Sequence, residues 1–190
     1  MAKAALKGFC AARLWPITTN SEEAYATSTM VPLPGAQQLT KDTSRSEYTI
    51  YADDGVYDSG SDFQYEDLTF TVAELTPELE AKLSGGSYDE TEKVYTFKAS
   101  DLAPEFAFGY AAMKLDGTYR MFKHYVVKLL SVKVDHASKG DTGDIAAYQL
   151  TLRATQRKAD GKIRDISDST GTNYDWLNQI EQFPKADAGA

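Results

Sequence analysis

The chain has 190 residues, a length that fits one domain with a single hydrophobic core. It is 42% hydrophobic and 25% charged, and no apolar run reaches the roughly 18 residues of a membrane span, so a disordered acidic tail and a membrane protein are both excluded. The formal net charge of −8 argues against a protein that binds nucleic acid through its phosphate backbone, because such binding needs Lys and Arg.

Charge is distributed unevenly along the chain. Residues 41–90 contain thirteen acidic and three basic side chains. Residues 114–139 contain six basic against two acidic, and residues 153–164 contain five basic against one. Such polarity predicts oppositely charged faces after folding, which matters for partners rather than for the fold.

Alternation with a period of two dominates the chain and predicts a mainly β fold. The strands expected from it are 7–17, 47–52, 65–74, 93–99, 105–115, 119–134, 147–157 and 163–166. The strand at 65–74 places its apolar side chains on one face and Asp67, Thr69 and Thr71 on the other. In the long run 119–134 the alternation changes phase around Val126, which predicts a bulge or bend.

A polar connection, rich in Thr and Ser, separates the first two strands at about residues 18–46. Unstructured loops longer than about 12–15 residues are uncommon in compact domains unless they are functional or disordered. The sequence therefore predicts a long functional loop here, one that is mobile in the free chain and orders on contact with a partner.

One short helix is expected at residues 76–84. Thr76 is an N-cap candidate, Pro77 occupies the first helical position, and Gly85-Gly86 closes the segment. Residues 171–190 follow a single domain at 1–170, and the apolar spacing around Trp176 predicts a short docked helix before a loose end at 185–190.

Motifs that carry chemistry are absent from the sequence. A calcium loop that started at Asp53 would place Asp58 where glycine is needed and Gln64 where glutamate is needed. His124 and His136 lack zinc-ligand spacing, and Cys10 is the only cysteine, which also fits synthesis in a reducing cytoplasm. No nucleophile elbow or phosphate-binding lysine loop is present. We therefore expect no catalytic residues, no metal, no cofactor and no enzyme activity.

Several long segments together resemble the major tail proteins of long-tailed phages with non-contractile tails. The resemblance is carried by KAALKGFCAARLWPI, LPGAQQLTKDTSRSEYTIYADDGVYDS, FQYEDLTFTVAELTPELEAKLSGGSYD, EFAFGYAAMKLDGTYRMFKHYVVKL and AYQLTLRATQRKADGKIRD. It covers about residues 2–166, with YADDG at Tyr51–Gly55, the helix signature and the LDGTYR hairpin as its more specific elements. The polar connection and the Trp176 segment match less well.

The resemblance implies a tail tube protein of the virion, synthesised in the host cytoplasm. Such a protein would be a β-sandwich, barrel-like, with one flanking helix, and would form six-membered rings stacked into the conduit for DNA ejection. Its implied partners are further copies of itself and the tape measure, tail terminator and distal tail proteins, with no membrane. DNA would pass through the tube without specific binding.

This reading assigns structural roles to three groups of residues. Two roles stay open at this stage, a local turn or a contact with a neighbouring subunit, for Tyr51, Asp53, Asp54 and Gly55. The stacking loop would contain Pro32, Pro34, Gly35, Lys41, Asp42 and Arg45. The face toward the channel would carry Asp67, Thr69 and Thr71, and Arg153 would need an acidic partner on that face because a free cation would hold DNA.

Two other classes of protein stay open at this stage. With 12% aromatic residues, the chain fits a monomeric carbohydrate-binding or adhesion β-sandwich module. A β-rich hydrolase with paired carboxylates is the third candidate, since any acidic chain supplies such pairs. Assembly distinguishes these classes, because a tube protein polymerises without ligand whereas a binding module stays monomeric and responds to glycans.

Overall fold

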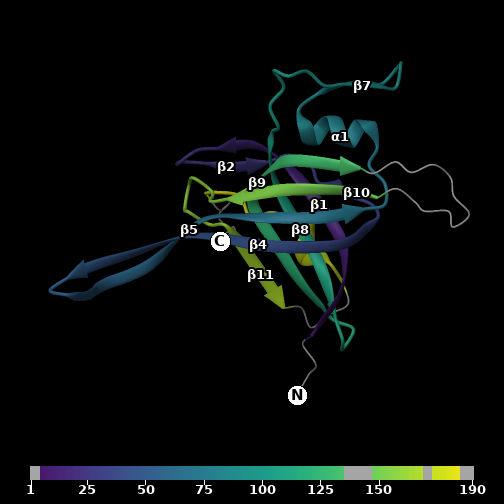
Figure 1. Cartoon of the computed structure of the whole chain (residues 1–190). Coiled ribbons are helices and arrows are strands. Elements are labelled where there is room, and N and C mark those ends of the chain that lie inside the picture. The colour runs from purple at the N-terminus through teal and green to yellow at the C-terminus, as the bar shows by residue number, and fades with distance from the viewer. Residues whose placement is uncertain (1–4, 135–146, 169–172, 185–190) are drawn as a thin grey trace, which may run out of the picture.

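The computed structural model describes residues 5–134, 147–168 and 173–184, and these residues form a mainly β fold (Figure 1). The N-terminal half contains β1 (Leu6–Asn20), β2 (Tyr25–Thr27), β3 (Val31–Pro32), β4 (Ala36–Ala52), β5 (Gly55–Val72) and α1 (Pro77–Ser84). The remainder contains β6 (Ser87–Asp89), β7 (Val94–Thr96), β8 (Glu105–Lys114), β9 (Tyr119–Val134), β10 (Tyr148–Thr155), β11 (Arg164–Asp168) and a 3₁₀ turn, η1 (Asp175–Asn178). The predicted fold class is therefore confirmed.

Nine of the described strands belong to one antiparallel sheet. Its main path runs β2-β1-β8-β9-β10-β5-β4, with β11 paired to β9 and β3 paired to β1. Although β1 and β4 lie far apart in this order, they contact each other, so the sheet curls around a core. That core includes Leu14, Phe70, Phe108 and Leu152, from four different strands, as the alternating apolar pattern requires.

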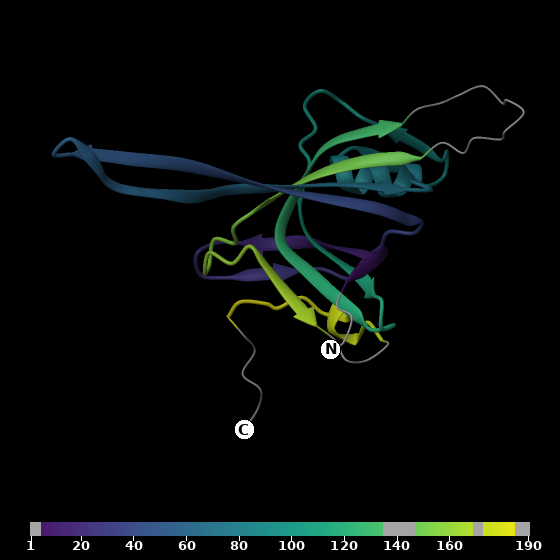
Figure 2. The ribbon, with the colours of Figure 1, turned by 60° about the horizontal axis from the view of Figure 1, so that its bottom comes forward.

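Strand β9 joins the two halves of the curled sheet. It pairs with β8 along its first part and with β10 along its second part, as Figure 2 shows. Phe106 lies opposite Val127 and Phe108 opposite His124, so β9 has an extra residue in this interval. The predicted bulge near Val126 is confirmed, and it lets one long strand serve both halves.

Helix α1 has the ends that the sequence predicts. The Thr76 Oγ1 atom accepts a hydrogen bond from the Leu79 backbone N–H at 3.3 Å, and Pro77 begins the helix. Gly85 ends it in the left-handed region, with φ of 83°. Leu79 and Leu83 insert into the main core, so the helix covers one end of the sheet.

The prediction of a long polar loop at residues 18–46 is wrong. Strand β1 continues to Asn20, β2 and β3 follow, and β4 already begins at Ala36. Leu33 is buried in the main core, and its N–H donates to the Ala12 carbonyl. Polar side chains along β4 hide its strand character, because neither of its faces is fully buried and the hydrophobic alternation is therefore missing.

The C-terminal segment, residues 173–184, packs on the outer face of β8 and β9. Leu177 is fully buried, and Ile180 joins a second core with Trp15 and Tyr125. Phe183 forms an isolated bridge with Tyr25. The segment docks as predicted, with a short 3₁₀ turn in place of an α-helix, while the predicted loose end at 185–190 lies outside the described residues.

Candidate assembly surface

Strands β4 and β5 continue beyond the body as a two-stranded ribbon, defined here as residues 44–65 (Figure 2). Glu66 is the last residue of β5 that pairs with β10, through Ala154. From Tyr65 to Gly55, the described partners of β5 all lie on β4. The ribbon therefore has two unpaired edges, and such edges are prone to pair with other chains.

Large apolar side chains on the ribbon face solvent. Tyr57 leaves 76% and Tyr51 74% of its surface exposed, which is unusual for aromatic residues in a single chain. The complete exposed set is Tyr48, Ile50, Tyr51, Val56 and Tyr57. Only Tyr51 belongs to the residues singled out from the sequence. Tyr48 and Ile50 lie in the predicted strand 47–52, whereas Val56 and Tyr57 were missed because GVYDSGSDFQ, rich in Gly, Ser and Asp, does not have the composition of a strand.

The tip of the ribbon is the turn that the YADDG stretch predicts. Ala52 pairs with Gly55, and the two residues between them lie in the left-handed region, with φ of 49° for Asp53 and 62° for Asp54. Positive φ at both central positions is the geometry of the tight hairpin turn that follows the twist of its strands, and Asp tolerates it. The turn role is confirmed, whereas a role in subunit contacts stays a prediction.

The ribbon is strongly acidic. Between residues 44 and 65 it carries five carboxylates against the single cation Arg45, whose Nη1 atom lies 3.5 Å from the Ser61 Oγ atom. The carboxylates are Glu47, Asp53, Asp54, Asp58 and Asp62. Exposed apolar groups combined with one sign of charge favour a partner surface that is apolar and cationic.

A polar face lies on the opposite side of β5 from the core. Asp67, Thr69 and Thr71 are half-buried there, alternating with the buried Leu68, Phe70 and Val72, so the predicted alternation is confirmed. The Thr69 and Thr151 hydroxyls approach to 3.5 Å across β5 and β10. Neighbouring strands extend the face: β4 places Thr40 opposite Thr69, and β9 places Ser131 opposite Thr151.

Arg153 has an acidic partner on this polar face. Its guanidinium donates from Nε and Nη2 to the two Asp67 carboxylate oxygens, at 2.8 and 2.9 Å. The same guanidinium lies 3.7 Å from the centre of the Tyr65 ring. The hydrogen bonds that Arg153 donates to Asp67 raise the pKa of Arg153, so its guanidinium stays charged.

The residues expected in a stacking loop occupy ordered positions. Pro32 ends β3, and Pro34 and Gly35 form the link to β4, where the Gly35 carbonyl accepts from the Ala73 N–H at 2.9 Å. Lys41, Asp42 and Arg45 lie on β4. Among these, Lys41 and Asp42 belong to the body and Arg45 to the ribbon, so the structure does not gather the group at one place.

An ionic cluster built around the buried Glu66 and His124 lies at the root of the ribbon. It contains Glu66 from β5, His124 from β9, Arg164 from β11 and Lys41 from β4. Arg164 donates to Glu66 Oε1, and the Thr43 hydroxyl donates to the same oxygen at 3.0 Å. His124 lacks zinc-ligand spacing in the sequence, and no spacing motif connects these four positions, because the pairing of distant strands brings them together.

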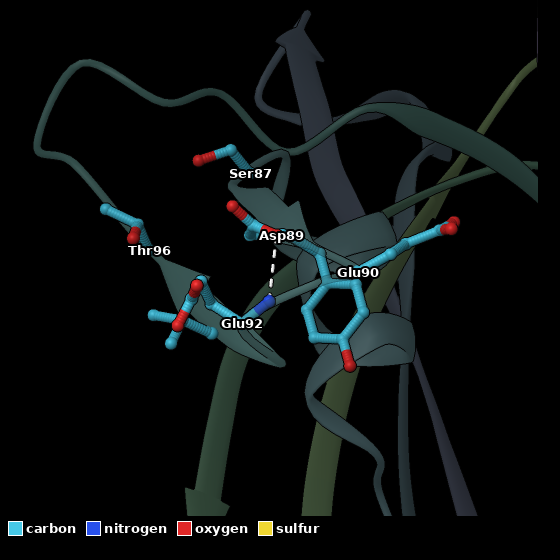
Figure 3. Close-up of a pocket in the computed structure, with 7 residues that line it drawn as sticks. Ser87, Asp89, Glu90, Glu92 and Thr96 are labelled. Atoms are coloured by element: carbon cyan, nitrogen blue, oxygen red, sulfur yellow. Dashed lines mark hydrogen bonds between the residues drawn. The ribbon is translucent and has the colours of Figure 1, made fainter.

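An open acidic hollow of about 730 Å³ lies at the β6–β7 hairpin (Figure 3). It is lined by Ser87, Asp89, Glu90, Glu92 and Thr96, among others. Asp89 Oδ1 accepts from the backbone N–H groups of Thr91 and Glu92, so this carboxylate stabilises the turn. Among the described residues, no group of three or more His, Cys, Asp or Glu side chains is arranged to hold a metal ion.

Within the described part of the chain, no helix has the length and apolar character to cross a membrane.

No protein-family model matches the sequence, and no curated protein matches it either. Solved structures that are similar to the chain include the PVC sheath–tube complex of an extracellular contractile injection system in its extended state, with 9% identity and a TM-score of 0.42. Another is the anti-feeding prophage cap, described as a tube-terminating cap, with 13% identity and a TM-score of 0.40. Both alignments cover 83% of this chain and 88% of the other. Similarity of this extent does not by itself identify a function.

Proposed function

We propose that the chain is a structural subunit that polymerises through its β4–β5 ribbon into stacked rings, forming a phage-type tail tube of the virion. The observation that carries the proposal is the ribbon itself, with two unpaired edges and five exposed apolar side chains. A two-stranded ribbon is at best marginally stable in water, and open edges invite pairing. A neighbouring subunit would cover both the edges and the apolar groups.

The proposed conduit is supported by the polar face of β4, β5, β10 and β9. Hydroxyl groups dominate its centre, and Arg153 is neutralised by Asp67. A wall that DNA slides past should offer few free cations, because each Lys or Arg on a phosphate releases counterions and holds the DNA. We infer that this face would line the channel and that its role requires neither catalysis nor a cofactor.

The resemblance of the sequence to tail tube proteins supports the finer features of the proposal. It implies six subunits in a ring, passage of DNA, and contacts with tape measure, tail terminator and distal tail proteins. It also implies that the protein belongs to the virion tail and is made in the host cytoplasm.

Electron microscopy of the purified protein tests this function directly. At high concentration we expect hollow tubes of constant diameter, without added ligand. A shortened variant replaces residues 47–61 by Asn-Gly, so that Ser46 still pairs with Asp62 in a two-residue hairpin. Circular dichroism should show a folded body, and microscopy should show no tubes.

The matched control is Asp116→Asn, which changes a carboxylate in the β8–β9 turn and leaves the ribbon untouched. This variant should form tubes like the natural protein. A natural protein that stays monomeric at every concentration and binds glycans would overturn the proposal in favour of a carbohydrate-binding module. Normal tubes from the shortened variant would show that the ribbon is not the assembly element.

A further inference from the structure

The cluster of Glu66, His124, Arg164 and Lys41 lies where the ribbon joins the body. Glu66 and His124 are buried, whereas Arg164 and Lys41 are partly exposed. Glu66 is the point at which β5 loses its β10 neighbour and continues into the ribbon. Arg164 lies directly opposite His124 in the β9–β11 pair. The cluster therefore ties β4, β5, β9 and β11 together where the ribbon leaves the body.

His124 is fully buried beside this carboxylate. Its Nδ1 atom lies 3.5 Å from Glu66 Oε2, and its ring is stacked on Tyr110 of β8, with 6.2 Å between ring centres and 12° between planes. Among the described residues, neither ring nitrogen of His124 nor Glu66 Oε2 has a hydrogen-bond partner. The ring is therefore enclosed but weakly held by polar contacts.

Charge balance in the cluster opposes protonation of the histidine. The side chains that face His124 are Glu66 from β5, Arg164 from β11, Lys41 from β4 and Tyr110 from β8. The single carboxylate already faces two cations, so an imidazolium would be a third positive charge in a buried place. Burial, reinforced by the charges of Arg164 and Lys41 and partly offset by Glu66, lowers the pKa of His124 to about 4.

We propose that this cluster is an acid-sensitive joint, through which mild acid loosens the ribbon root and β11 before the rest of the sheet. When the root opens and His124 reaches water, its imidazole binds a proton that it does not bind in the closed cluster. Acid therefore favours the open root. This device concerns the free chain and does not depend on whether the protein forms tubes.

The direction follows from proton linkage. An imidazole in water has an ordinary pKa of about 6.5, so the open form binds more protons than the closed form as the pH falls from about 6.5 toward 4. Across that window the opening equilibrium should rise by up to about tenfold per pH unit. Although burial acts to raise the pKa of Glu66, hydrogen bonds from Arg164 and Thr43 and the charge of Arg164 hold it below its ordinary value. Its contribution is lost only as the pH falls below about 4.5.

Hydrogen–deuterium exchange between pH 6.5 and 5 tests the joint, because most carboxylates stay ionised in this range. After correction for intrinsic exchange rates, protection of peptides that cover 41–46, 60–68 and 164–168 should fall by several-fold to tenfold per pH unit. Strand β8 should keep its protection. In parallel, NMR should show that the His124 ring of the natural protein does not titrate near pH 6.5.

The matched variants are His124→Gln and His136→Gln, since the chain contains only two histidines. The first should remove the pH dependence at the root, whereas the second should retain it. An unchanged pH dependence in His124→Gln, a uniform loss of protection in all strands, or titration of His124 near pH 6.5 would overturn the proposal. The NMR titration needs no variant, so the test survives if His124→Gln does not fold.

Discussion

At the scale of single residues, the pairing of Arg153 with Asp67 explains how a cation is accommodated on a polar strand face. Alternation places Arg153 there, and the β5–β10 register places Asp67 directly opposite. The bidentate geometry and the Tyr65 ring fix the guanidinium. Because both side chains remain partly exposed, the pair is expected to contribute modestly to stability.

A double-mutant cycle with Asp67→Asn and Arg153→Gln would measure this contribution. We expect a coupling free energy of about 0.5–1 kcal/mol in urea unfolding at low salt, decreasing at 1 M salt because the charges are screened. Lys82 and Glu78 form a solvent-exposed pair on α1 that serves as a matched control, and their coupling should be weaker because both side chains are more exposed. A coupling near zero for Asp67 and Arg153 would show that Arg153 does not depend on this carboxylate.

Among the elements, α1 is specified by residues adjacent in sequence, whereas the ribbon is specified by contacts between two strands. Thr76, Pro77 and Gly85 each act on neighbouring backbone, so the helix boundaries can be read from a few adjacent residues. The ribbon depends instead on cross-strand contacts such as Tyr48 over Gly60, which are paired residues of β4 and β5. Its polar strands therefore look like a loop until their register is known.

Gly85 and Gly117 have similar positive φ angles, but only Gly85 has a close neighbour. Replacing each by alanine therefore separates the cost of backbone strain from the cost of a steric clash. Gly85 has φ of 83°, and an added Cβ atom there would lie 2.2 Å from the Leu102 carbonyl oxygen. Gly117, in the β8–β9 turn, has φ of 86° and open space around it. We expect Gly117→Ala to reduce the free energy of unfolding by about 1–2 kcal/mol, and Gly85→Ala to reduce it by more.

Urea unfolding followed by circular dichroism would give both values. Equal losses for the two variants would mean that α1 and the Leu102 backbone move apart easily, which would contradict tight packing at the helix end. A larger loss for Gly117→Ala would contradict it as well.

At the scale of the whole molecule, the basic regions are mostly neutralised within the chain. Asp168 contacts both Lys114 and Arg120, and Asp160 contacts Arg157. The ribbon differs, because none of its five carboxylates forms a salt bridge among the described residues. If subunits assemble as proposed, the ribbon carries acidic charge for pairing with a neighbour's cations.

We therefore expect tube assembly to weaken as salt rises from 0.1 M to 1 M, where the Debye length falls from about 10 Å to about 3 Å. Light scattering at fixed protein concentration measures this dependence. The variant Asp53→Asn/Asp54→Asn keeps residues that tolerate positive φ and removes two charges, so it should reduce the salt dependence. Assembly that strengthens with salt would contradict charge pairing and indicate repulsion between ribbons.

Features that depend on neighbouring residues can be predicted from the sequence of this chain. Period-two patterns predict the second half of β5, from residue 65, and β10, the capping residues predict α1, and two aspartates before a glycine predict the turn at the ribbon tip. Even the bulge in β9 is visible as a change of phase in one strand. Each of these signals acts over a few residues, through backbone angles, caps or alternating burial.

Features that depend on strand register can be seen only in the three-dimensional structure. Residues 36–46 become a strand because β5 supplies hydrogen bonds to them, although their composition favours a loop. Arg153 meets Asp67, and His124 meets Glu66, across 86 and 58 positions of sequence. No local pattern encodes such distances, because the pairing of whole strands sets them, and the position at which β5 leaves β10 decides where the body ends and the ribbon begins.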